Sequence, residues 1–190
     1  MSGSNSFKFV MLPPDVPVPD GGVAITTEST CPRCQILWRR DPYTVYIAHG
    51  PPRKLSPLPF EALRAEIQTS DYPAQLHVTQ QATFRVRVRN ISNTSWLARE
   101  RAGDQFQVNL GNHWLNQNGE AVANDDGRAP LMRDLKPGEE AEFQLTINAP
   151  KDPGDYILEI DMLQEGVSWF ALRGSKTVRM PVKVFKRWFD

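Results

Sequence analysis

The sequence predicts an all-β protein: an antiparallel β-sandwich with a proline-rich N-terminal extension. Three observations indicate this fold. Apolar and polar residues alternate in five segments after residue 60, turn-forming sequences separate these segments, and ten of the 16 prolines lie in residues 1–60. We therefore predict an arm over residues 1–60, a sandwich over residues 61–185 and an aromatic, basic tail over residues 186–190.

The N-terminal arm is predicted to be largely extended. Proline lacks the N–H group that a sheet ladder needs, so this proline density disfavours a sheet formed by the arm alone. Val16–Pro19 and Pro51–Pro52 are typical of polyproline II geometry. Ala24–Thr27 and Thr44–Ala48 favour short strands, because they are rich in β-branched or aromatic residues. We expect the arm to become ordered by packing on a neighbour and to be dispensable for folding of the sandwich.

The strands of the sandwich are predicted from a period of two. In Ala82–Asn90 the residues Phe84, Val86 and Val88 alternate with arginines, which is the pattern of a strand with one buried face. The same period occurs in four further segments, Phe106–Leu110, Phe143–Ile147, Tyr156–Met162 and Val178–Val184. Turn sequences lie at Asn116–Gly119, Lys136–Gly138 and Asp152–Gly154.

One segment of the sandwich fits two patterns. Within Phe60–Thr69, the spacing of Phe60, Leu63 and Ile67 fits a helix. Leu63, Ala65 and Ile67 fit one face of a strand equally well. We predict a strand, because the segments that follow have the strand period and no convincing helix occurs among them.

A pattern after the first clear strand resembles a known family. Arg89–Trp96 reads R-N-I-S-N-T-S-W, which is similar to the N-x-S-x-x-x-W corner of bacterial immunoglobulin-like domains found beside glycosyltransferases and sugar methyltransferases. Later phrases follow in the same order: N-H-W at 112–114, G-R at 127–128, L-K-P-G at 135–138, A-P at 149–150, P-G-D-Y at 153–156 and E-G-V-S-W-F at 165–170. The chain more distantly resembles the four-tryptophan domain of autophagy receptors.

The resemblance covers residues 63–185. It implies an immunoglobulin-like β-sandwich of seven to nine strands with a non-catalytic role, in which the domain recognises carbohydrate or protein. It implies no defined set of ligand-binding residues, and the N-terminal arm lies outside it.

Composition excludes several classes of partner. The net charge is zero and 23% of the residues are charged, which is untypical of a nucleic-acid-binding protein. No apolar run approaches the roughly 18 residues of a membrane span. The longest run near the start, Phe9–Leu12, is also too short for the core of a signal peptide. We therefore expect no membrane span and a cytoplasmic location, although export by a route without such a signal stays open.

Metal and cofactor sites are not expected. Cys31 and Cys34 form a single C-x-x-C, which supplies half of a four-ligand zinc site at most. Two free thiols are the favoured interpretation, with a disulfide or a shared zinc as the alternatives. The acidic run Asn124–Gly127 suits calcium, but it lacks a glutamate at the spacing of a calcium loop, so a plain turn is favoured.

Catalysis is not expected either. A hydrolytic site needs a nucleophile, a base and an orienting group in one pocket, and His113 and Asp161 belong to no such motif. The candidate binding residues are instead aromatic: Trp114, Trp169 and Phe170 in the sandwich, and Trp188 and Phe189 in the tail. Aromatic rings stack on sugars, but packing in the core is the commoner role. Because neighbours on a strand point to opposite faces, we expect one ring of the pair Trp169 and Phe170 to be exposed.

The sequence thus predicts a non-catalytic interaction or structural subunit. Its arm and tail would dock onto protein subunits, either copies of itself or other chains. The alternative is a carbohydrate-binding module that assists a separately encoded polysaccharide-modifying enzyme. Neither interpretation involves a cofactor or a nucleic acid.

Overall fold

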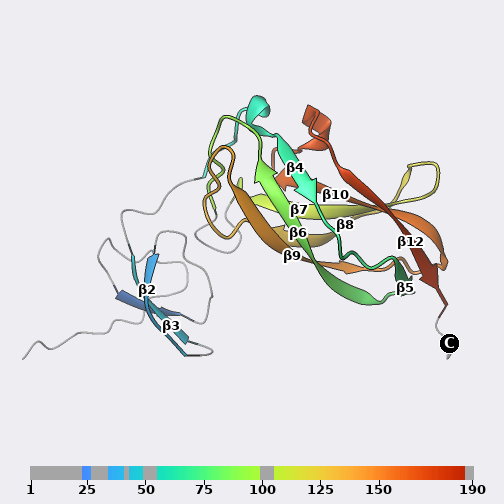
Figure 1. Ribbon diagram of the computed structural model, residues 1–190, viewed down its shortest axis with the longest axis horizontal. Coiled ribbons are helices and arrows are strands. Elements are labelled where there is room, and N and C mark those ends of the chain that lie inside the picture. The colour runs from blue at the N-terminus through green and yellow to red at the C-terminus, as the bar shows by residue number, and fades with distance from the viewer. Residues whose placement is uncertain (1–22, 27–33, 41–42, 49–54, 99–104, 187–190) are drawn as a thin grey trace, which may run out of the picture. The chain divides into compact units, whose positions relative to one another are not determined.

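The computed structural model describes residues 23–26, 34–40, 43–48, 55–98 and 105–186 of the 190-residue chain (Figure 1). The chain divides into two compact units, Met1–Arg53 and Lys54–Asp190. Every described element is a β-strand, except for two three-residue 3₁₀ turns in the second unit. The predicted all-β fold class is therefore confirmed.

The first unit contains a small antiparallel sheet with the strand order β1-β3-β2. The strands are β1 (Val23–Thr26), β2 (Cys34–Arg40) and β3 (Tyr43–Ala48). β1 and β3 overlap the two short strands that were expected in the arm. They pair in a sheet of the first unit although proline density disfavoured one, because the prolines of this segment lie outside the three strands. β2 was not predicted, because a bulge between Ile36 and Trp38 breaks the period of two.

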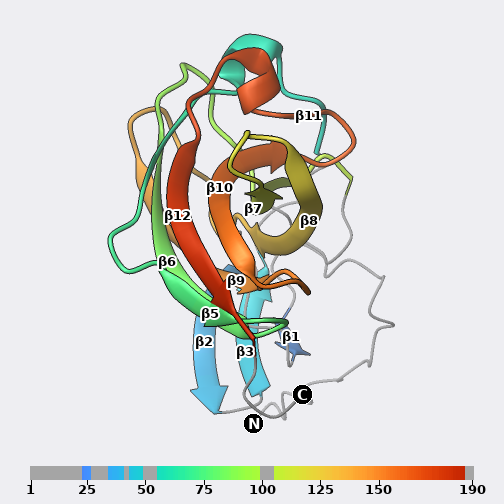
Figure 2. The same ribbon diagram turned by 90° about the vertical axis from the view of Figure 1, so that its right-hand side faces the viewer.

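The second unit is an immunoglobulin-like sandwich of two sheets. One sheet has the order β4-β6-β9, and the other has the order β5-β12-β10-β7-β8 with β11 beside β10. The strands are β4 (Ala65–Gln68), β5 (Gln75–His77), β6 (Gln81–Asn90), β7 (Val108–Leu115), β8 (Ala121–Pro130), β9 (Glu140–Asn148), β10 (Gly154–Gln164), β11 (Ser168–Trp169) and β12 (Val178–Phe185). All neighbours are antiparallel except β5 and β12. Figure 2 shows β12, β10, β7 and β8 following one another across the second sheet.

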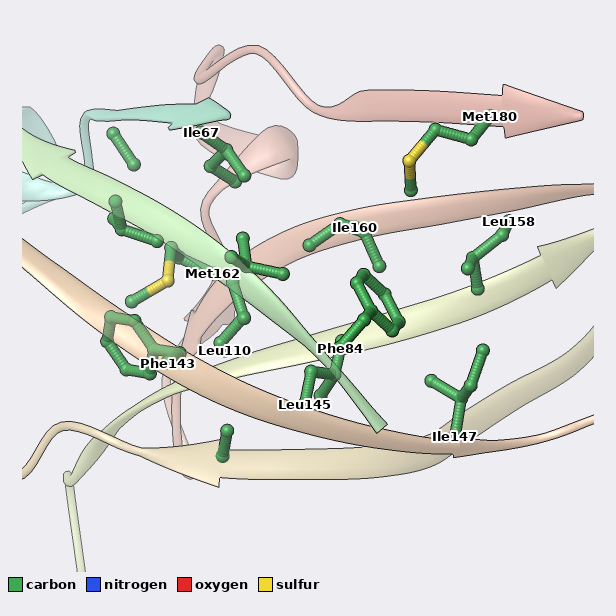
Figure 3. Close-up of a cluster of buried hydrophobic side chains, with 14 of the residues drawn as sticks. Ile67, Phe84, Leu110, Phe143, Leu145, Ile147, Leu158, Ile160, Met162 and Met180 are labelled. Atoms are coloured by element: carbon green, nitrogen blue, oxygen red, sulfur yellow. The ribbon is translucent and has the colours of Figure 1, made fainter. Parts of the chain in front are cut away.

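The core lies between the two sheets, as the period of two predicts. Side chains alternate between buried and exposed along β6 and β9, and the apolar ones are buried. In Figure 3, Phe84 and Leu145 from the first sheet face Leu158 and Ile160 from the second. Each such side chain contributes about 1.5–3 kcal/mol when it is removed from water. Hydrophobic burial on one face of each sheet therefore determines the register of the strands.

Two segments differ from their prediction. Phe106 was expected to begin a strand, but it lies in a turn at the positive φ of 62°, and β7 begins at Val108. Asn124–Gly127 was expected to be a turn, but it lies inside β8. Pairing with β7 outweighs the low strand propensity of these polar residues, because β8 gains a ladder of hydrogen bonds along its length.

Within Phe60–Thr69, Ala65–Gln68 forms a strand as predicted, whereas the first three residues form a single 3₁₀ turn. This turn is η1 (Phe60–Ala62), and β4 follows it and pairs with the end of β6. The second 3₁₀ turn, η2 (Ala171–Arg173), lies between β11 and β12. Both turns lie at the same end of the sandwich, drawn in cyan and orange-red at the top of Figures 1 and 2.

The sandwich unit begins before residue 61, where the sequence placed the boundary. Leu55 is buried. The side chain of Gln164 at the end of β10 then holds the residues that follow: its Oε1 accepts from the Leu58 N–H at 2.8 Å, and its Nε2 donates to the Ser56 carbonyl at 3.0 Å. These contacts join residues 55–58 to the sandwich.

The corner after β6, residues 90–96, has a clear structural role. The buried Asn90 amide donates to the carbonyls of Thr94 and Leu135, both at 2.9 Å, while its Oδ1 accepts from the Ser92 N–H and hydroxyl. Trp96, also buried, donates its indole N–H to the Ala62 carbonyl at 2.9 Å. The corner therefore fixes η1 to the core.

Candidate functional site

The end of the sandwich that carries η1 and η2 has an unusual surface. This end carries Leu172, Ile91 and Phe60, which are exposed at 74%, 53% and 51%. They are the three most exposed large apolar side chains among the described residues of the second unit. Together with Arg64 and Arg173 they form a surface that we call the end patch. Large apolar side chains gathered in this way commonly mark an interaction surface.

Direct contacts connect Phe60, Arg64, Arg173 and the backbone of Ile91, and Leu172 directly precedes Arg173 in the chain. The guanidinium carbon of Arg173 lies 3.7 Å from the centre of the Phe60 ring, which is a cation–π contact. Arg64 donates through Nη1 to the carbonyls of Phe60 and Leu63 at 3.4 and 2.9 Å. The Ile91 N–H donates to the Arg64 carbonyl at 3.2 Å. Arg64 thus connects η1 with the end of β6.

The exposed residues of η2 are held by contacts of their neighbours on both sides. Before them, Phe170 is fully buried and meets the Trp96 ring edge-on, with 5.3 Å between ring centres. After them, the Ser175 hydroxyl accepts from the Ala65 N–H at 3.0 Å and donates to the Ala65 carbonyl at 3.2 Å. Leu172 is therefore presented from a fixed backbone.

The arginines of the end patch differ from most others in the sandwich. Arg85, Arg87, Arg128, Arg133 and Arg179 each lie within 4.0 Å of a carboxylate oxygen. Over the described part of the chain, Arg64 and Arg173 have no such ion pair. Arg64 is used for backbone carbonyls and Arg173 for the Phe60 ring, so their charges stay uncompensated by acidic side chains.

A second group of candidate side chains lies around Trp169 of β11, beside β7 and β8. Trp169 is half-buried there, with the His113 ring centre at 4.1 Å and the Arg128 guanidinium carbon at 4.8 Å. Trp169 and Arg128 approach the backbone closely because residue 111 is a glycine: a Cβ at this position would be 2.8 Å from Trp169 Cη2 and 2.6 Å from Arg128 Nη1. The Glu165 carboxylate accepts from Arg128 Nε at 3.2 Å.

Asp161 is a buried acid on the same sheet. Its Oδ1 accepts from the Met162 N–H at 2.7 Å and its Oδ2 accepts from the Ala171 N–H at 3.0 Å. Burial, with a smaller contribution from the charge of Glu159, raises the pKa of Asp161 to about 7, although the two N–H groups lower it. Asp161 therefore connects β10 with the first residue of η2.

The acidic run considered for calcium is used for packing. Asp126 accepts from the Trp114 indole N–H at 2.8 Å and from the Asn148 backbone and side-chain nitrogens at 2.9 and 3.0 Å. These bonds join β7, β8 and β9. Within the described ranges, no group of three or more His, Cys, Asp or Glu side chains is placed to hold a metal ion. Cys31 and the side chain of Cys34 lie outside the description.

The structure separates the predicted binding residues into three groups. Trp114 and Phe170 are fully buried, so their assignment to a binding surface is corrected: both rings pack in the core. Trp169 is half-buried and is the more exposed member of the neighbouring pair, although neither ring is fully exposed. Trp188 and Phe189 lie outside the described residues. The sequence analysis did not find Leu172 and Arg173, because no period or motif marks a single 3₁₀ turn.

Comparisons with known proteins give similarity at the level of solved structures only. No family model and no curated protein matches the chain. Spo0M, a sporulation control protein from Bacillus subtilis, is 14% identical over 64% of this chain and 49% of its own, with a TM-score of 0.40. A CARDB domain from Pyrococcus furiosus is 18% identical over 65% of this chain and 93% of its own, with a TM-score of 0.36.

A β-glucosidase from Listeria innocua is 15% identical over 66% of this chain, with a TM-score of 0.40. The matched region spans about half of Spo0M and 16% of the β-glucosidase. The fold assignment rests on the two sheets and their strand order. The predicted links to glycosyltransferase-associated domains and to autophagy receptors stay predictions from sequence.

No helix in the described ranges is long and apolar enough to span a membrane. The cytoplasmic location stays a prediction.

Proposed function

We propose that this protein is a non-catalytic interaction subunit whose sandwich binds a protein partner through the end patch. The observation that carries this proposal is the convergence of Leu172, Ile91 and Phe60 with two arginines that have no carboxylate partner among the described residues. Protein interfaces concentrate their binding free energy in a few apolar, aromatic and arginine side chains. The end patch has this composition.

The energetics of the end patch support specific binding. Burying a side chain the size of leucine or phenylalanine contributes about 1.5–3 kcal/mol, and Leu172 is the most exposed of them. Association also costs the ordering of loops and side chains at the interface. That cost is small here, because Phe170 and Ser175 already fix the backbone on both sides of Leu172.

The described titratable groups support a non-catalytic role. Both oxygens of Asp161 accept backbone N–H groups, and the His113 ring packs against Trp169. Neither arrangement resembles a base placed beside a nucleophile. The expectation that the protein is not an enzyme is part of the proposal.

The arm and the tail belong to the same proposal as further docking elements. In the first unit, Ile25 and Tyr43 are exposed. At the start of the tail, Phe185 is partly exposed beside His77, with 6.4 Å between ring centres. Trp188 and Phe189 keep the docking role that the sequence predicts for them.

Carbohydrate binding is the second candidate function, and it is supported by Trp169. This half-buried ring lies beside Arg128 and Glu165, and an aromatic ring with polar neighbours suits a sugar. The contacts of Trp169 with His113 and Arg128 occupy part of the ring. We therefore place this function second.

A photo-crosslinking amino acid at position 172 tests the proposed function. Position 122 serves as the matched control, because Val122 is also an exposed apolar residue but lies in the β7–β8 hairpin. We expect a discrete crosslinked protein from position 172 in the producing cells, absent from position 122 and lost when Arg173→Glu is added. Equal crosslinking from both positions, or none from position 172, would contradict the proposal.

A further inference from the structure

We propose that the partner of the end patch is an acidic protein segment with an apolar anchor residue; this inference rests on the proposed function of that surface. The anchor would contact Leu172 and the Phe60 ring, and the carboxylates would pair with Arg64 and Arg173. Three features of the end patch support this inference: its charge, the placement of the two guanidinium groups and the apolar side chains beside them.

The charges at this end of the sandwich are mostly positive. Over the two segments 60–64 and 171–176, Arg64, Arg173 and Lys176 carry positive charge and Glu61 alone carries negative charge. None of the three cations has an ion pair with an acidic side chain in the described ranges. An acidic partner would supply the carboxylates that these cations lack, and it would associate faster at low salt.

The two guanidinium groups converge on η2. Arg173 stacks on Phe60, and a Cβ added at Gly174 would lie 3.9 Å from Arg64 Nη2. Arg64, two residues after η1, therefore reaches Gly174, which directly follows Arg173. Stacking on Phe60 fixes the plane of the Arg173 guanidinium, whose N–H edges suit a carboxylate in a two-point contact.

The apolar side chains decide between an acidic protein segment and other anionic partners. Nucleic acid is bound mainly by many cations along its phosphates, whereas the described segments 60–64 and 171–176 supply three cations beside Leu172, Ile91 and Phe60. An anionic membrane likewise attracts clusters of basic residues. A protein segment uses both parts of the end patch, because one apolar side chain can be buried while neighbouring carboxylates meet the arginines.

Selection from a displayed library of random dodecapeptides tests this inference on the full chain. Peptides retained by the wild-type protein should be enriched in Asp and Glu together with Leu or Phe, relative to the input library. The double variant R64E/R173E should lose this enrichment. The control variant Lys151→Glu reverses an exposed charge between β9 and β10 and should retain it.

The best selected peptide should then bind the wild-type protein at least tenfold more tightly than two relatives, one with lysine in place of each acid and one with serine in place of the apolar anchor. It should shift the amide resonances of residues 60–64 and 171–176. No enrichment, enrichment of basic peptides, or shifts confined to other residues would overturn the inference. Binding to phosphatidylserine vesicles that is stronger than any peptide binding and is lost in R64E/R173E would also overturn it, in favour of a membrane.

The two proposals fail in different ways. A crosslinked protein at position 172 without acidic enrichment would leave the interaction function in place and remove the acidic partner. Failure of both experiments would remove the end patch as an interaction surface.

Discussion

Arg173 stacks on Phe60, with the guanidinium carbon 3.7 Å from the ring centre. The two residues come from opposite ends of the sandwich sequence, and each lies in a single 3₁₀ turn. Their contact joins η1 and η2 into one surface. It also keeps a cation and an aromatic ring exposed together, which is the feature on which the proposed function rests.

A double-mutant cycle of Phe60→Ala and Arg173→Ala should give a coupling free energy of about 0.5–1 kcal/mol, the range for an exposed cation–π contact. Urea unfolding of the wild type, both single variants and the double variant measures it. A parallel cycle of Phe60→Ala with Arg179→Ala serves as the control, because Arg179 pairs with Glu159 instead. A coupling near zero in the first cycle would contradict the contact.

The corner after β6 should be a large source of stability. Asn90→Ala leaves the Ser92 N–H without its acceptor and removes one of two donors to the buried Leu135 carbonyl, whose other donor is the Trp96 N–H. An unsatisfied buried group costs about 1–3 kcal/mol. We expect the free energy of unfolding to fall by about 2–4 kcal/mol. Asn93→Ala, an exposed neighbour in the same corner, should change it by less than about 0.5 kcal/mol. Equal effects of the two substitutions would contradict this role of Asn90.

Asp161 should make stability depend on pH. Because burial raises its pKa from 3.8 to about 7, the folded protein binds this proton more tightly than the unfolded chain does. The contribution is present in full below about pH 4 and is lost as the pH rises through about 7, so stability falls across this range. A shift of about three pKa units corresponds to about 4 kcal/mol.

Unfolding free energies between pH 4 and pH 8 check this prediction. Asp161→Asn should flatten the fall, whereas Glu142→Gln, which changes an exposed carboxylate on β9, should leave it unchanged. A wild-type stability that rises over this range by the same amount in all three proteins would show that Asp161 does not titrate in this way.

Deletions should place the boundary of the sandwich before Leu55. A chain of residues 54–190 should unfold cooperatively. A chain of residues 59–190 should be less stable by about 2–4 kcal/mol, because it loses the buried Leu55 side chain and both hydrogen bonds from Gln164 to this segment. Thermal unfolding of the two chains compares them directly. Equal melting temperatures would place the boundary at residue 60 instead.

Much of the sandwich could be predicted from its hydrophobic period. β6 and β9 bury alternate residues, so their sequences show which face lies in the core. β8 could not be found in this way, because its Asn, Asp and Gly residues are held in a strand by pairing with β7 and by the bonds of Asp126. β2 could not be predicted for a different reason: its bulge makes the ladder irregular, and the period of two fails there.

The candidate site was less predictable than the fold. Composition shows that Trp114 and Phe170 are aromatic, but only the packing of the two sheets shows that they are buried. Leu172 reads as an ordinary apolar residue until η2 turns it toward solvent. Arg173 meets Phe60 through a long-range contact that no local pattern encodes. Exposure and distant pairing are properties of the folded chain.

The most direct test of the central claim is the affinity of the protein crosslinked at position 172 for the wild type and for Leu172→Asp. We expect Leu172→Asp to lose at least a hundredfold in affinity, because Leu172 contributes to binding. Its free energy of unfolding should stay unchanged within about 0.5 kcal/mol, because Leu172 is exposed and lies outside the core. Val122→Asp should change neither quantity. Undiminished affinity in Leu172→Asp would contradict the assignment of the end patch as the binding surface.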